Sequence, residues 1–158
     1  MSNSQSDLSL SVAARKRRLS IFAKAGEEAL APLFERFAVA HPIEDYTILR
    51  VPEVGTSMVR GRTGGSGAAF NLGEMSVTRI SVRLPSGAVG HGYVQGRSKD
   101  AARMAALLDA MAEDGFADGV DDLVTTPLEG AAQTARAARA AKAAATKVEF
   151  FTMVRGEG

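Results

Sequence analysis

Residues 75–95 read MSVTRISVRLPSGAVGHGYVQ, and this stretch decides the fold. Apolar and polar residues alternate on both sides of Pro85-Ser86-Gly87, which is a sequence typical of a hairpin turn. Residues 46–51 and 56–63 have the same period of two. Because the connections are too short for parallel crossovers, we predict a four-stranded antiparallel sheet with strands at 46–51, 56–63, 75–84 and 88–95.

Helical patterns flank these strands. Two stripes of apolar residues, one within 12–23 and one within 30–37, predict two N-terminal helices separated at Gly26. After the last strand, Ser98 is a suitable N-cap for a packing helix that carries Met104, Leu107, Leu108 and Met111. The acidic stretch 109–129 reads as an irregular connection. Residues 130–147 hold ten alanines and predict a further helix. The expected class is therefore α+β.

Three regions follow from this pattern: a flexible polar leader (1–11), an α+β domain (12–127), and a helical C-terminal arm with an interaction tail (128–158). The tail contains the extended run 148–154, which is apolar on both faces. Such a strand needs cover on both sides. Two interpretations carry about equal weight: the arm folds back on its own sheet, or it reaches into a partner subunit. In the second, the binding residues are Phe150, Phe151, Met153 and Arg155.

Composition excludes several classes of protein. The net charge of +1 disfavours a general binder of nucleic acid or membrane surfaces. Cysteine is absent, which excludes disulfides and thiolate metal sites, and with two histidines we expect no metal site. No apolar leader precedes the basic run at 15–18, and no 18 apolar residues run together, so we expect a cytoplasmic protein.

The charges are segregated along the chain. Residues 50–103 hold eight bases and three acids, whereas residues 109–129 hold seven acids and no base. The basic segment also contains most of the glycines: ten of sixteen lie between Gly55 and Gly96. Glycine permits close backbone approach and arginine offers a planar fork of donors, so a phosphorylated or phosphonylated ligand is the first hypothesis.

Several residues are candidates for this anion site. Residues 61–67 read GRTGGSG, which fits a nest of backbone amides about as well as it fits a flexible connection. Arginines on an open sheet face are more often simply solvated, so for these the structural interpretation stays ahead. The turn before the predicted packing helix is a sharper candidate, because cations and a helix N-terminus coincide there. The full set is Arg60, Arg62, Gly64, Gly65, Gly67, Arg79, Arg83, Arg97 and Lys99.

His91 is a weak candidate for a general acid or base. It shares a strand face with Tyr93 and Gln95. A packed or hydrogen-bonded strand histidine is the favoured interpretation, and the catalytic residues remain unknown.

Three ordered blocks of residues carry a family resemblance. They are the segment 61–67, the strands with Gly73-Glu74, Thr78-Arg79 and Tyr93-Val94-Gln95-Gly96-Arg97, and the closing Phe150-Phe151-Thr152-Met153-Val154-Arg155-Gly156. In this combination the chain, over roughly residues 12 to 157, resembles the PhnG family, small subunits of the bacterial carbon-phosphorus lyase system.

The resemblance implies a role in phosphonate catabolism. PhnG-like proteins work with PhnH, PhnI and PhnL, in a core assembly that also contains PhnJ, and a homodimeric contact within the assembly is compatible with this. The implied reaction forms alpha-D-ribose 1-methylphosphonate 5-triphosphate from ATP and methylphosphonate and releases adenine. The main catalytic groups belong to the PhnI-like partner. ATP with Mg²⁺ is then a substrate of the complex, with no cofactor bound by this chain alone. The alternative is a structural adaptor that touches no substrate.

Overall fold

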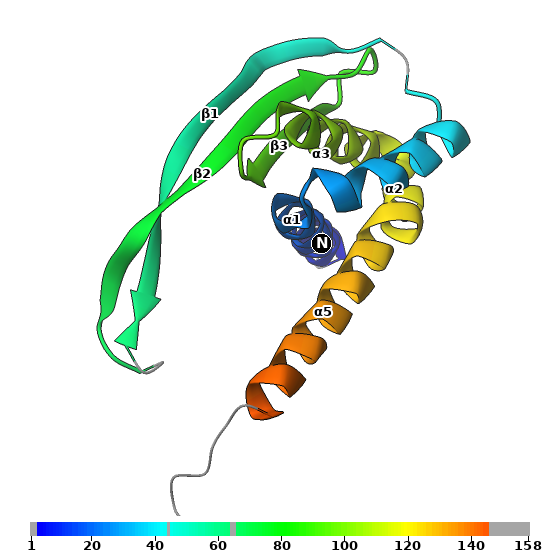
Figure 1. Cartoon of the computed structure of the whole chain (residues 1–158). Coiled ribbons are helices and arrows are strands. Elements are labelled where there is room, and N and C mark those ends of the chain that lie inside the picture. Colours follow the sequence, from blue (N-terminus) through cyan, green and yellow to red (C-terminus); the bar gives the residue numbers. More distant parts are fainter. Residues whose placement is uncertain (1–2, 44, 64–65, 146–158) are drawn as a thin grey trace, which may run out of the picture.

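The computed structural model describes residues 3–43, 45–63 and 66–145. In chain order (Figure 1) the elements are α1 (Asn3–Ala25), α2 (Glu27–Ala40), β1 (Thr47–Arg62), β2 (Ala69–Arg83), β3 (Val89–Gln95), α3 (Lys99–Met111), the π-helical turn η2 (Ala112–Phe116), α4 (Ala117–Val120), the π-helical turn η3 (Asp121–Thr125) and α5 (Thr126–Ala145). The α+β class, the N-terminal helices and the long C-terminal helix are confirmed.

The sheet has three strands, in the order β1-β2-β3, so the prediction of four strands was wrong. The predicted strands 46–51 and 56–63 are one continuous strand, because the chain stays paired between them: Glu53 faces Arg79 and Val54 faces Thr78. Pro52 is tolerated there because β1 lies at the edge of the sheet. Register shifts on both sides of Arg50 absorb the irregularity.

The antiparallel arrangement and the predicted hairpin are confirmed. Leu84 N–H donates to the Ala88 carbonyl at 2.9 Å, and Gly87 takes a φ of 98°, which glycine adopts without strain. The strand before the turn is longer than predicted, since β2 begins at Ala69 rather than at residue 75.

The core lies between α3 and one face of the sheet. α3 is buried along most of its length, and β3 contributes Val94 to the same interior. Gly90 and Gly92 let this helix approach: a Cβ at Gly92 would lie 2.0 Å from the Ala102 carbonyl oxygen, and one at Gly90 would lie 2.0 Å from the Ala106 carbonyl oxygen. Two of the glycines that suggested an anion site therefore serve helix packing.

The acidic stretch 109–129 is helical rather than irregular, apart from Gly115 with its φ of 98°. Four of its seven acids pair with arginines of α1, more than 90 residues earlier in the chain. Arg15 pairs with Asp109 and Glu113, while Arg18 pairs with Asp121. Without this partner the clustered carboxylates would repel each other, and the sequence pattern alone does not reveal it.

α1 begins at Asn3, within the stretch 1–11 that we expected to be a leader. Residues 3–14 contain neither glycine nor proline, so nothing in them stops the helix.

Two elements project from this body (Figure 1). The outer parts of β1 and β2 form a long two-stranded ribbon, and α5 extends away from the helices. Residues 130–145 of α5 are all exposed. None of the described helices is long and apolar enough to cross a membrane.

Candidate functional site

The open face of the sheet collects polar and charged side chains. Arg79 lies opposite Tyr93, Ser81 opposite His91 and Arg83 opposite Val89. Directly opposite residues point to the same face, whereas their neighbours Ile80 and Val82 are buried under α3. β1 adds Arg50, which faces Ser81. The sheet thus presents three arginines, a histidine and an exposed tyrosine on one surface.

An ion pair between half-buried Arg15 and buried Asp109 fixes the edge of this surface. Asp109 of α3 is fully buried, and its Oδ2 accepts from the His91 backbone N–H at 2.9 Å. Arg15 donates to Asp109 at 2.8 and 3.0 Å and to the Val89 carbonyl at 3.1 Å. The hydrogen bond to Asp109 raises the pKa of Arg15 above its ordinary value. These bonds use two backbone groups at the free edge of β3, the Val89 carbonyl and the His91 N–H, and hold α1 beside the site.

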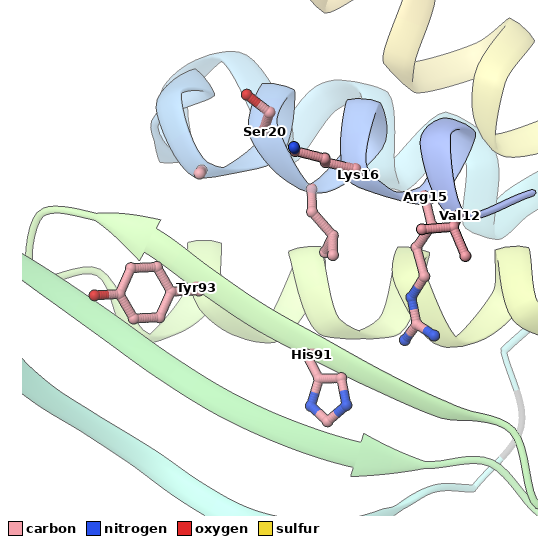
Figure 2. Close-up of a pocket in the computed structure, with 8 residues that line it drawn as sticks. Val12, Arg15, Lys16, Ser20, His91 and Tyr93 are labelled. Carbon is pink, nitrogen blue, oxygen red and sulfur yellow. The ribbon is translucent and has the colours of Figure 1, made fainter. Parts of the chain in front are cut away.

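Two hollows meet at Tyr93. The larger, about 490 Å³, lies between α1 and β3, where Arg15, Lys16 and Ser20 are opposite His91 and Tyr93 (Figure 2). The second, about 380 Å³, lies between Tyr93, Arg79 and the part of β1 around Glu53 to Thr56. A Tyr93 ring flanked by cations can contact a planar ring, and the cations can contact an anion.

The arginines of the open face differ in availability. Glu53 accepts from Arg79 at 3.1 Å and from Arg50 at 3.4 Å, so one carboxylate already neutralises part of their charge. The Arg83 side chain is exposed and makes no hydrogen bond or ion pair with another residue in the described ranges. Arg79 and Arg83 do share a face, as the spacing predicts.

Arg60 and Arg62 lie at the far end of the ribbon, away from this face. Arg60 lies opposite Asn71 in the register of β1 and β2, and the Arg62 side chain donates to the Gly67 carbonyl at 3.2 Å. Gly67 N–H donates to the Thr63 carbonyl at 3.0 Å, so this amide is already used within the turn. Gly64 and Gly65 lie outside the described residues.

Arg97 and Lys99 flank the N-terminus of α3 and are exposed. Ser98 caps this helix as predicted, accepting from the Ala101 N–H at 2.9 Å. It also donates to Glu27 of α2 at 2.6 Å, which places a carboxylate beside the helix end. The structure therefore spreads the proposed anion-binding residues over three places rather than one.

His91 is exposed, and its Nδ1 lies 2.9 Å from Ser81 Oγ. This is the hydrogen-bonded strand histidine that the sequence favoured. The tail residues Phe150, Phe151, Met153 and Arg155 lie outside the described residues.

Sequence reasoning missed three contributors to the site: Arg50, Lys16 and Tyr93. Tyr93 was noticed only as a neighbour of His91. The basic run at 15–18 is visible in the sequence, but its approach to β3 depends on the pairing of Arg15 with Asp109. The described residues hold no group of three His, Cys, Asp or Glu side chains arranged to bind a metal.

These features define a small α+β protein with a cationic open sheet and two projecting elements. Residues 13–156 match the family described as phosphonate metabolism protein PhnG, and the chain belongs to this family. A relative from Rhizobium meliloti (strain 1021), named as the PhnG subunit of alpha-D-ribose 1-methylphosphonate 5-triphosphate synthase, is 46% identical over 113 residues, which cover 69% of this chain and 70% of the relative.

Proposed function

We propose that this chain is an obligate subunit of the complex that transfers the ribose 5-triphosphate of ATP to methylphosphonate. In this reaction a phosphonate oxygen forms a bond to C1 of the ribose while the bond from C1 to adenine breaks. The observation that carries the proposal is the family match over 13–156 together with the named function of the relative.

The open sheet face is the place where this chain would contact substrate. A triphosphate and a phosphonate are polyanions, which suit Arg79, Arg83 and Lys16, and Tyr93 offers a surface for a base. Arg97 and Lys99, and the ribbon arginines, are secondary positions for the same anions. Mg²⁺ would arrive with ATP, and we assign no residue of this chain to it.

The chain is not expected to catalyse the reaction alone. The His91 ring has Ser81 as its hydrogen-bond partner, and no described carboxylate pairs with this ring as in a catalytic dyad. We therefore place the main catalytic groups in a PhnI-like partner, with PhnH-like, PhnJ-like and PhnL-like subunits in the same cytoplasmic assembly. The tail residues Phe150, Phe151, Met153 and Arg155 are proposed to bind a partner.

The second candidate function is a structural adaptor, favoured by the Arg79 pairing with Glu53. Two sets of variants in the co-purified complex separate the candidates. If the chain contacts substrate, Arg79→Ala or Arg97→Ala will lower adenine release with assembly intact. If it is an adaptor, those changes will be nearly silent, while Phe150→Ala or Phe151→Ala will dissociate the complex.

A further inference from the structure

β1 and β3 are the two edge strands of the sheet, and they differ in whether side chains bind their outer backbone groups. At the edge of β3, Arg15 binds the Val89 carbonyl and Asp109 binds the His91 N–H, as described above. β1 forms the other edge and, among the described residues, pairs with β2 alone. A free edge strand presents unpaired backbone groups that can bind another strand.

Only the half of β1 nearer the body is protected against pairing with another strand. Near the body, Pro52 and the register shifts around Arg50 break the regular row of backbone groups. From Val54 to Val59 the pairing with β2 is uninterrupted, and the segment reads VGTSMV, without charge or proline. This half of the edge is open to strand addition.

The same part of the ribbon is incompletely covered. Val54 is 40% exposed, Met58 52% and Leu72 65%. A two-stranded ribbon is marginally stable in water, and a third strand would stabilise it. The open edge and the exposed apolar side chains therefore both indicate that the ribbon binds a third strand.

The chain contains a segment with the required chemistry. Residues 148–154 read VEFFTMV, a run apolar on both faces that follows α5. In the antiparallel register that places Thr152 opposite Thr56, Phe150 meets Met58 and Val154 meets Val54. Arg155 then lies opposite Glu53, so apolar and charged positions match together.

The position of α5 favours a second copy as the source of this strand. Figure 1 shows the end of α5 separated from the ribbon. Only three Cα steps, about 11 Å at most, lead from Ala145 to Val148. A strand paired from Val148 onward has little chain with which to cross to its own ribbon, whereas two copies can exchange tails reciprocally and close the pair.

We propose that the edge of β1 from Val54 to Val59 binds residues 148–154 of a second copy of this chain as an added antiparallel strand. Because the sequence lacks cysteine, introduced thiols report this contact directly. Thr56→Cys in one full-length copy and Thr152→Cys in a differently tagged copy are expressed together with the other subunits and treated with a mild oxidant. Facing residues of paired strands lie within disulfide distance.

The expected result is a shift of both tags, without reductant, to one gel band at twice the mass of the chain. Val39→Cys, on α2 and 84% exposed, replaces Thr56→Cys in the control and should not shift. Absence of the mixed band overturns the proposal. The proposal is also overturned if a chain that carries both Thr56→Cys and Thr152→Cys forms only an intramolecular disulfide. Adenine release is not part of this readout, so failure of the proposed enzyme function would leave the result interpretable.

Discussion

Asp109 is the residue on which the edge of the open sheet depends. Its buried carboxylate accepts from Arg15 and from the backbone of His91, and so joins α3, α1 and β3. Asp109→Ala leaves the His91 N–H and the Arg15 Nε without their acceptor, while Arg15 keeps Glu113 and the Val89 carbonyl, and we expect it to lower the free energy of unfolding by about 2 kcal/mol. Asp109→Asn keeps one acceptor oxygen and should cost less. Denaturant titration measures both, and a loss below about 1 kcal/mol for Asp109→Ala would contradict the assignment.

Glu129 makes the free energy of unfolding depend on pH. The hydrogen bond donated by Arg17 lowers the pKa of Glu129 below its ordinary value of 4.5. As the pH falls below 4.5, the unfolded state takes up this proton before the folded state does. The stabilisation is therefore present above pH 4.5 and is lost as the pH falls through the folded pKa.

We expect Glu129→Gln to be slightly less stable than the parent at neutral pH and to show a shallower loss of stability in acid. Urea midpoints measured from about pH 7 to about pH 3 check this. Asp118→Asn is the control, because Asp118 is exposed and has no ion pair with a described residue. Equal acid slopes for Glu129→Gln and the parent would rule out the effect.

At the scale of elements, the contact between α3 and β3 has no room for a methyl group. We expect Gly92→Ala to lower the free energy of unfolding by about 3 kcal/mol, because its Cβ would meet the backbone of α3. Gly73→Ala is the matched strand control, since nothing lies within 4 Å of its Cβ position. Thermal unfolding compares the two, and similar losses would show that close packing is not the reason for Gly92.

Most elements could be predicted from local sequence. The hairpin at 85–87, the cap at Ser98 and the amphipathic helix after it depend on neighbouring residues, and all three are present. The fusion of two predicted strands into β1 was missed because Pro52 reads as a break unless the strand is known to be at an edge.

The site was less predictable than the elements. Arg79 and Arg83 share a face because a strand has a period of two, which sequence supplies. The helical form of 109–129 and the approach of α1 to Tyr93 depend on pairs such as Arg15 with Asp109, separated by 94 residues. No local pattern encodes such a pair.

At the scale of the whole molecule, the protein consists of a packed body with a ribbon and a helix that project from it (Figure 1). The ribbon exposes apolar side chains and α5 is exposed from residue 130 to 145, which is expected of a chain that functions within an assembly. The cationic sheet face lies on the body, next to the root of the ribbon. Substrate contact and partner contact are thus assigned to different parts of the chain.

The most direct test of the proposed function measures adenine release from ATP and methylphosphonate by the co-purified complex, prepared with and without this chain. We predict that adenine is released only when the chain is present, and that adding the purified chain back restores the reaction. Full release by a complex that lacks the chain would contradict its role as an obligate subunit.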